Sequence, residues 1–424
     1  MTHNCFVNYR FSANLIHSSK RYGLMAQSRF IFMAQQPMDT KIGSNAIDMA
    51  YEISKRHEVL YVNIPMDRIT KLRNKEEDRD FLKRRKEVAN GSRKPLEKIR
   101  ENLWQLTPGI TLESINTLPD GSLFDKLNMW NNRKLSAVIL GAVQELGWDS
   151  YYLLNDSDMF RGYYMKELLN PSGFIYYSRD NLREVDYFKK HGTRIEPLLM
   201  AKADACVTNS AYLRDECAKF NANSYDIGQG CDLSAFDPSI SHERPSVFPD
   251  TQAPIIGYVG ALIELRLDIP LLEELAKRAQ HLHFVFTGPQ DAAFEKSKLH
   301  GMENVTFTGP CKPTDAPQFV SHFDVCINPQ RIHPMTIGNY PRKIDEYLAL
   351  GKPTVATLTR AMEMFSDHVY LAEDADGYLA AFEKALNDNS AELQEDRRKF
   401  ALTHSWENSI EKMYEAMRSV GLSI

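Results

Sequence analysis

Paired cysteines, long apolar runs and a large excess of one charge are all absent from this 424-residue sequence. The six cysteines are scattered and form no C-x-x-C pair, so we expect reduced thiols, not a disulfide framework or a zinc site. No apolar run has the roughly 18 residues of a membrane-spanning helix. A formal net charge of -5 is too mild to indicate nucleic acid as a partner. We therefore expect a cytoplasmic protein.

The first 28 residues are polar and basic and contain no apolar stretch typical of a signal peptide. We expect residues 1–28 to be a disordered tail. Alternatively, translation begins at Met25, just before the first strand-like run, in which case residues 1–24 are not expressed.

Two long stretches of alternating strand and helix patterns indicate two domains. The first, residues 29–240, opens with the strand-like run Arg29–Ala34, and the second, residues 241–400, alternates from Pro254 onward. Between them, four prolines without helix or strand period predict an interdomain linker. Residues 401–424 contain a helical pattern with apolar residues at Trp406 and Ile410, which could pack back toward the N-terminal domain.

Strands alternating with helices of this length predict parallel sheets covered on both faces. We expect an α/β fold of two Rossmann-like, doubly wound domains that face a cleft. Ligands of open α/β sheets bind beyond the carboxyl ends of the strands, so this cleft is the predicted site.

The most informative segment is Asn339–Thr357, with the sequence NYPRKIDEYLALGKPTVAT. Pro341 suits the first turn of a helix, on which Lys343 and Glu346 lie three residues apart. A cation and a carboxylate at such a position could hold a diphosphate and a pair of ribose hydroxyls. The alternative is an ordinary surface pair, in which Arg342 and Glu346 interact at i and i+4.

This segment resembles the donor-site region of GT-B glycosyltransferases, particularly those near glycosyltransferase family 4 and the teichuronic-acid-biosynthesis type. In these, a P-x-K-x-x-E-Y-L-A-x-G-K-P run holds the nucleotide sugar. Other stretches fit in the same order: ADACVTNSAYLRD, IGQGCDLSAF, GYVGALIELRLD, FVFTGP, NVTFTGP and FDVCINP. The resemblance extends from about Ser28 to the C-terminus and is weak between Ile69 and Gly147.

The resemblance implies roles for particular residues in the second half of the chain. Lys343 and Arg266 would stabilise the departing diphosphate, and Glu346 would bind the ribose hydroxyls. The other implied donor-binding positions are Gly260, Ala261, Gly288, Pro289, Gly338, Asn339 and Tyr340. Many family 4 members carry a first glutamate where this chain has Gly338, so the donor sugar and the stereochemistry stay open.

Residues of the first half are expected on the acceptor side. Similar enzymes pass the loop after the first strand, which here contains Gly43 and Asn45, against the donor or acceptor. A helix cap with a flexible turn is the alternative there. Asp180 follows a strand where the family often has an acidic residue, which makes it a third catalytic candidate beside Lys343 and Arg266.

Asp156-Ser157-Asp158 is a competing signal, because the GT-A glycosyltransferases bind a divalent metal through a D-x-D at a strand end. The other interpretation is a loop with capping aspartates. A second Rossmann-like half has no place in GT-A, so we expect neither a metal site nor a cofactor.

Residues 68–100 contain thirteen Lys and Arg against six Asp and Glu. A solvated amphipathic surface is the ordinary explanation. The functional one is peripheral association with an anionic membrane, at the inner face, which would suit a lipid-linked acceptor.

Together these features predict a metal-independent, hexosyltransferase-like enzyme. It would move a sugar from a nucleotide-sugar donor to a cell-envelope or polysaccharide acceptor, either a glycan or a lipid-linked molecule. Two alternatives stay open: a nucleotide-sugar epimerase on the same fold, and a catalytically silent nucleotide-binding protein.

Overall fold

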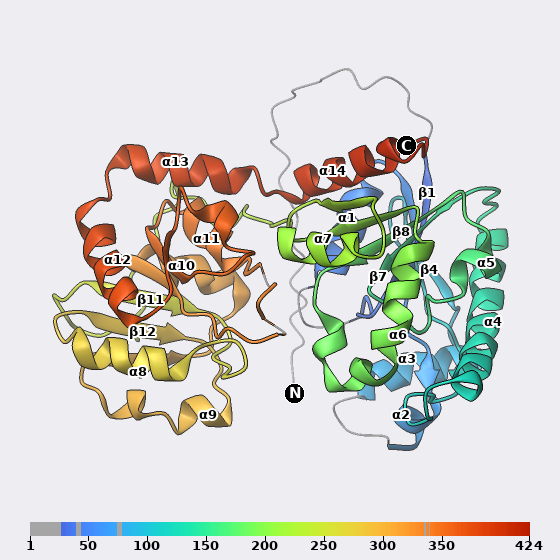
Figure 1. The fold of residues 1–424 in the computed structure, drawn as a ribbon, viewed down its shortest axis with the longest axis horizontal. Coiled ribbons are helices and arrows are strands. Elements are labelled where there is room, and N and C mark those ends of the chain that lie inside the picture. Colours follow the sequence, from blue (N-terminus) through green and yellow to red (C-terminus); the bar gives the residue numbers. More distant parts are fainter. Residues whose placement is uncertain (1–26, 40–43, 74–78, 335, 339) are drawn as a thin grey trace, which may run out of the picture.

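The protein forms two α/β domains that lie side by side, with the C-terminal helices running along one side of both (Figure 1). The computed structural model describes residues 27–39, 44–73, 79–334, 336–338 and 340–424. The predicted disordered tail, Gly43 and Asn339 therefore lie wholly or largely outside the described residues. No helix in these ranges is long and apolar enough to cross a membrane.

The N-terminal domain is built on an eight-stranded sheet, and β4, which runs antiparallel to β5, is the one exception to parallel pairing among its described strands. In spatial order the strands are β10 (Ser224–Asp226), β9 (Ala205–Thr208), β8 (Gly173–Ser178), β7 (Tyr152–Asp156), β1 (Arg29–Ala34), β2 (Glu58–Val62), β5 (Leu103–Leu106) and β4 (Leu96–Arg100). A short pair, β3 (Met66–Asp67) and β6 (Thr111–Leu112), lies apart from this sheet. The central strands are nearly continuous apolar runs, as expected for strands buried on both faces.

The C-terminal domain is built on a six-stranded parallel sheet. Its order is β13 (Val305–Gly309), β12 (His283–Thr287), β11 (Ile255–Val259), β14 (Val325–Asn328), β15 (Thr354–Thr357) and β16 (Tyr370–Ala372). The strand order reverses at β1 in one sheet and at β11 in the other. The carboxyl ends of these two strands are therefore the points where open sheets bind ligands.

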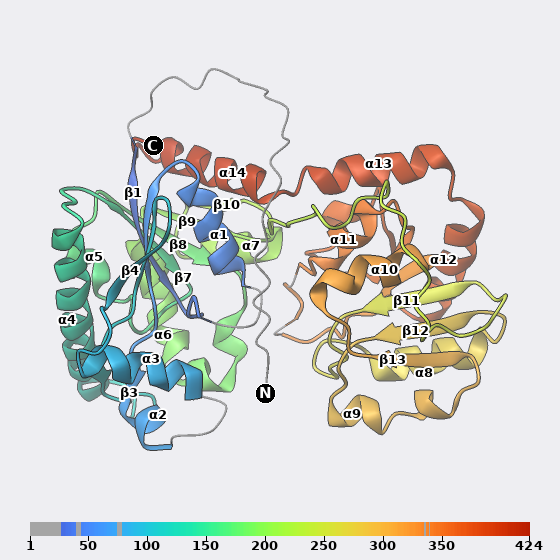
Figure 2. The same ribbon diagram turned by 180° about the vertical axis from the view of Figure 1, so that it is seen from behind.

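Helices cover both faces of each sheet (Figure 2). The N-terminal domain contains α1 (Asn45–Ser54), α2 (Arg68–Arg73), α3 (Arg79–Ala89), α4 (Ser122–Glu145), α5 (Met165–Leu169), α6 (Asp186–Lys202) and α7 (Ala211–Ala218). The remaining helices are α8 (Ile269–Arg278), α9 (Ala292–Glu295), α10 (Ala316–Ser321), α11 (Lys343–Ala349), α12 (Ala375–Asn387), α13 (Ala391–Leu402) and α14 (Trp406–Ser419). Local sequence sets their ends: the Asp268 carboxylate accepts a hydrogen bond from the Leu271 amide at the start of α8.

The chain crosses between the domains twice, at adjacent places. Phe236 and Phe248 are buried in the C-terminal core, so the first crossing lies near Cys231, before the proline-rich stretch. After α13, the chain returns through Ser405 into α14, whose Ile410 is buried in the same core as Phe30 of β1. The two crossings pair with each other, since the Cys231 amide donates to the His404 carbonyl at 2.9 Å and Cys231 forms a β-bridge with Ser405.

Candidate functional site

Two glycine loops meet at the carboxyl edge of the C-terminal sheet. Gly260 follows β11 and Gly288 follows β12, with φ angles of +148° and +149° that only glycine adopts easily. A Cβ atom on Gly288 would overlap the carbonyl oxygen of Gly260, so the two loops touch through their backbones. Next to them, Ala261 and Pro289 are exposed. This edge therefore offers bare backbone that a phosphate group could approach closely.

Helix α11 brings two polar side chains to these loops. It begins at Lys343, two residues later than the predicted start at Pro341, and it buries Ile344, Tyr347 and Leu348. The Tyr347 hydroxyl accepts a hydrogen bond from the amide of Val259, the last residue of β11. This bond fixes the helix against the strand that precedes the first glycine loop.

The Lys343 ammonium lies directly over the first glycine loop. A Cβ placed on Gly260 would be 3.2 Å from the Lys343 Nζ atom, and this atom is 4.9 Å from the centre of the Tyr258 ring. No ion pair joins Lys343 to any carboxylate among the described residues. Its charge is therefore available to an anion at the loop.

Glu346 is half-buried on the same helix. Burial raises the pKa of its carboxyl, against the opposing effect of the Lys343 and Arg342 charges. Within the described part of the chain, its carboxylate has neither a hydrogen bond nor an ion pair. A buried carboxylate without donors favours a ligand that brings hydroxyl donors of its own.

Arg342 does not form the predicted surface pair with Glu346. Its guanidinium instead donates to Asn45 and Asp48 of α1, both at 3.1 Å, and so bridges the two domains. The predicted acceptor-side residue Asn45 is thus in contact with the residue that precedes Lys343. Gly43, its predicted partner, lies outside the described residues.

Of the other donor-side predictions, Tyr340 and Gly338 are placed in unexpected surroundings. The Tyr340 ring is buried, and its hydroxyl donates to Asp345 at 2.6 Å, so its side chain is turned into the core instead of bordering a sugar. A Cβ on Gly338 would overlap the ring of Tyr212 from α7, and the Gly338 carbonyl accepts a hydrogen bond from Ser210. Sequence reasoning missed Tyr212, because only the fold brings α7 to this loop.

Arg266 and Asp180, the two remaining catalytic candidates, come from different domains. Arg266 is exposed, and no ion pair or side-chain hydrogen bond engages it among the described residues. Half of the Asp180 side chain is accessible, yet the surrounding protein raises the pKa of its carboxyl, while the charges of Arg179 and Arg266 lower it. The structure therefore brings together Lys343, Glu346 and the glycine loops on one domain, and Asp180 of the other domain lies within electrostatic reach of Arg266.

Comparison with known proteins identifies the fold and the C-terminal half. Residues 253–388 match the family model Glycosyl transferases group 1. Over 221 residues the chain is 28% identical to the Bacillus subtilis protein named as teichuronic acid biosynthesis glycosyltransferase TuaH. That match covers 49% of this chain and 55% of TuaH, so the chain matches only about half the length of this curated relative.

The solved structures extend the likeness to nearly the whole chain. Anabaena HepE in complex with UDP gives a TM-score of 0.62 at 15% identity, covering 92% of this chain and 100% of that one. Sucrose-phosphate synthase from Thermosynechococcus elongatus gives 0.62 at 13% identity, covering 93% and 99%. The catalytic domain of Arabidopsis thaliana starch synthase IV, bound to ADP and acarbose, gives 0.59 at 10% identity, covering 93% and 100%.

The protein has the GT-B fold, and residues 253–388 of its C-terminal half are similar to the group 1 glycosyl transferases. The predicted fold class and resemblance are thereby confirmed, and the GT-A alternative for the D-x-D sequence is excluded by the fold. In this GT-B chain the two aspartates are buried and paired with arginines. The Asp156 carboxylate accepts from Arg179 at 2.8 Å, and Asp158 lies 2.7 Å from Arg161.

The described residues contain no cluster of three or more His, Cys, Asp or Glu side chains able to hold a metal ion. The Asp156 and Arg179 pair lies at the carboxyl ends of β7 and β8, and Arg179 also reaches Gln36 beyond β1. These contacts hold a buried ion pair at the carboxyl edge of the N-terminal sheet.

Several cations of the basic segment, residues 68–100, form contacts within the N-terminal domain. Arg84 pairs with Glu97, Arg68 pairs with Glu113, and Arg85 is fully buried with its Nε atom donating to the Ile64 carbonyl. Arg100 lies over the Tyr51 ring. These contacts are those of a structural surface, and membrane association stays a prediction.

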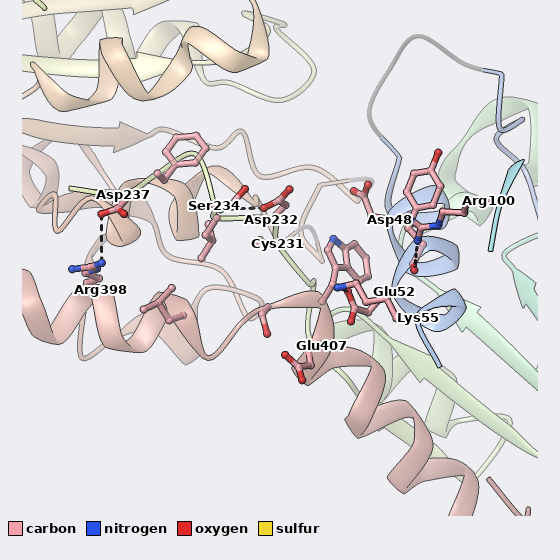
Figure 3. A pocket seen from close by; sticks show the side chains of 16 residues that line it. Asp48, Glu52, Lys55, Arg100, Cys231, Asp232, Ser234, Asp237, Arg398 and Glu407 are labelled. Carbon is pink, nitrogen blue, oxygen red and sulfur yellow. Dashed lines mark hydrogen bonds and ion pairs between the residues drawn. The ribbon is translucent and has the colours of Figure 1, made fainter. Parts of the chain in front are cut away.

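A cavity of about 540 Å³ lies on the crossing side of the GT-B junction, away from the predicted donor residues. Figure 3 shows Asp48, Glu52 and Lys55 of α1 opposite Cys231 and Asp232 of the first crossing, with Glu407 at the start of α14. Lys55 pairs with Glu52, and Arg398 lies 3.6 Å from Asp237. None of the predicted site residues that the structure describes lines this cavity.

Proposed function

We propose that the protein is a glycosyltransferase that moves a sugar from a nucleoside-diphosphate sugar to an acceptor seated on the N-terminal domain. The observation that carries the proposal is the placement of the Lys343 ammonium over the Gly260 loop, beside a Glu346 carboxylate without a described partner. A cation, bare backbone and a free carboxylate match the charge and the hydroxyls of a nucleoside diphosphate.

The C-terminal domain would hold the donor. Lys343 and Arg266 would offset the charge that develops on the departing diphosphate, which is where electrostatic stabilisation is most effective. Glu346 would accept hydrogen bonds from the ribose hydroxyls. The binding of UDP by HepE and of ADP by starch synthase IV, both with the same fold, supports a nucleotide at this place.

The N-terminal domain would hold the acceptor and complete the site. Asp180 lies within electrostatic reach of Arg266, and its carboxylate could orient or deprotonate an acceptor hydroxyl. Closure of the two domains would exclude water and align the reactants. In this scheme the chemistry is supplied by side chains, without a metal ion.

For the acceptor, we propose a cell-envelope glycan or a lipid-linked precursor, in line with the name of the B. subtilis relative. Residues 68–100 would hold the enzyme at an anionic membrane surface. Co-sedimentation with vesicles of phosphatidylglycerol and phosphatidylcholine tests this directly. Binding at low salt that is lost at high salt supports it, and no binding at low salt ends it.

The first test of the function is a thermal-shift panel with UDP, GDP, ADP and TDP and their sugars. A nucleotide that binds only the native state raises the melting temperature. Calorimetry then compares the wild type with Glu346→Ala, for which we expect at least a tenfold rise in the dissociation constant, roughly the cost of lost hydrogen bonds to a charged group. Unchanged affinity would remove Glu346 from the site.

Product analysis separates transfer from the alternatives. Consumption of the donor only when an acceptor extract is present supports the transferase. Conversion of the donor sugar without an acceptor indicates an epimerase, and tight nucleotide binding with no turnover across a broad acceptor panel indicates a silent binding protein.

A further inference from the structure

Asp345 is a fully buried carboxylate on α11 on which three hydrogen-bond donors converge. Its Oδ2 atom accepts from the Tyr340 hydroxyl at 2.6 Å and from the Cys231 thiol at 3.3 Å, and its Oδ1 atom lies 2.7 Å from Nδ1 of His404. The rings of Phe365 and Phe400 surround His404 and exclude water from this cluster.

The three partners of Asp345 come from three different segments. Tyr340 belongs to the loop before α11, Cys231 to the first crossing and His404 to the second. The two crossings are also paired with each other through the Cys231 amide and the His404 carbonyl. The Asp345 carboxylate therefore connects α11, the proposed donor helix, to both crossing segments, about which the domains would rotate.

Asp345 is adjacent in sequence to Glu346 and two residues after Lys343, on a helix only seven residues long. So short a helix moves as one body, and a change in its orientation at Asp345 moves both neighbours. We propose that Asp345 is a positioning residue, which with His404 couples the orientation of the donor helix to the angle between the domains. This rests on the proposed function, because it assigns Asp345 a part in that reaction.

The test is Asp345→Asn in the full chain. The amide keeps the size of the side chain but has a single acceptor oxygen, so at least one of the three donors would face an N–H group. Because Lys343 and Glu346 keep their positions relative to each other when the helix tilts, we expect the dissociation constant for the nucleotide identified by the panel to change less than about threefold. We expect kcat for transfer to fall about tenfold or more, as the loss of a buried hydrogen bond implies.

A second readout does not depend on nucleotide binding. Hydrogen exchange in Asp345→Asn should accelerate about tenfold in three segments, 228–232, 343–349 and 403–406, as expected when a shared tether is lost. His404→Asn, which leaves the Tyr340 and Cys231 contacts in place, should produce the same pattern more weakly. This second variant keeps the proposal testable if Asp345→Asn does not fold.

The matched control is Glu196→Gln. Glu196 is also a buried carboxylate that accepts from a tyrosine hydroxyl at 2.6 Å, but it lies within the N-terminal domain on α6. It should leave kcat and exchange at the crossings unchanged. The proposal is overturned if Glu196→Gln reproduces the effects, if exchange at the crossings stays at the wild-type rate, or if kcat and nucleotide affinity fall in step. If the wild type binds no nucleotide, the proposed function fails, while the exchange data still decide whether the tether exists.

Discussion

The two faces that meet between the domains use their charges differently. On the N-terminal side, the buried carboxylates of Asp156 and Asp158 are each matched by an arginine. On the C-terminal face, Lys343 and Glu346 have no ion-pair partner among the described residues. The difference supports the proposal that the C-terminal face holds a charged ligand, while the paired aspartates of the N-terminal side stabilise its fold.

The largest expected effect is that of Gly288→Ala, which attacks the glycine contact of the C-terminal face. The new Cβ would overlap the Gly260 carbonyl, and alanine is strained at φ +149°. We expect a loss of about 3 kcal/mol of stability, together with loss of nucleotide binding. Chemical denaturation and calorimetry measure both. Gly301→Ala is the control, because nothing lies within 4 Å of its added Cβ and it should bind nucleotide normally.

Lys343→Ala removes the unpaired cation from the same face. We expect kcat for transfer to fall about a thousandfold, because the lost charge would stabilise the leaving diphosphate. Steady-state kinetics with the identified donor measure this effect. The control is Lys277→Ala, at an exposed position of α8. An equal loss of kcat in both variants would mean that general surface charge, not the position of Lys343, determines the rate.

Asp180→Asn tests the opposite face. We expect kcat to fall about a hundredfold if the carboxylate acts on the acceptor hydroxyl. Nucleotide affinity should stay within about twofold of the wild type, since Asp180 belongs to the other domain. A large loss of nucleotide affinity would contradict the division of labour between the faces.

Glu346→Gln should make the free protein more stable at neutral pH. Because burial raises the pKa of Glu346, the folded state holds this proton more tightly than the unfolded state does. Ionisation therefore lowers stability as the pH rises above the usual glutamate pKa, and glutamine avoids this cost. We expect a gain in the free energy of unfolding at pH 7 that disappears near about pH 4. Denaturation curves at both values measure it, and exposed Glu383→Gln should show no such dependence.

Much of the fold could be predicted because the central strands, such as β1 and β12, are short, continuous apolar runs. Runs this short and apolar are typical of buried strands in a parallel sheet, not of helices. Helix α4 could not be predicted from its sequence pattern, because its buried face includes Asn131 and Asn132. The side chains of these residues form hydrogen bonds with backbone groups that are distant in the sequence. Such partners exist only in the folded chain, and their polarity hides the periodicity.

The candidate site shows the same limit. Lys343 and Glu346 follow from local spacing and from the family resemblance. The contacts of Gly338 with Tyr212, of Arg342 with Asp48, and of Asp345 with His404 all join residues from different domains or crossings. They depend on how the two domains are docked, which no local pattern encodes.

The return of α14 to the N-terminal domain has a consequence for biosynthesis. Residues 233–402 form a continuous C-terminal domain that can fold as soon as it has left the ribosome. One face of the N-terminal sheet is covered only in part at that moment, by α1, because Ile410 and Met413 of α14 also belong to its core. Usually the domain that is synthesised first is also the first to fold. Here the N-terminal domain completes its fold last, when α14 packs against its sheet. Until residues 406–419 emerge, that apolar face is exposed to chaperones and to neighbouring nascent chains.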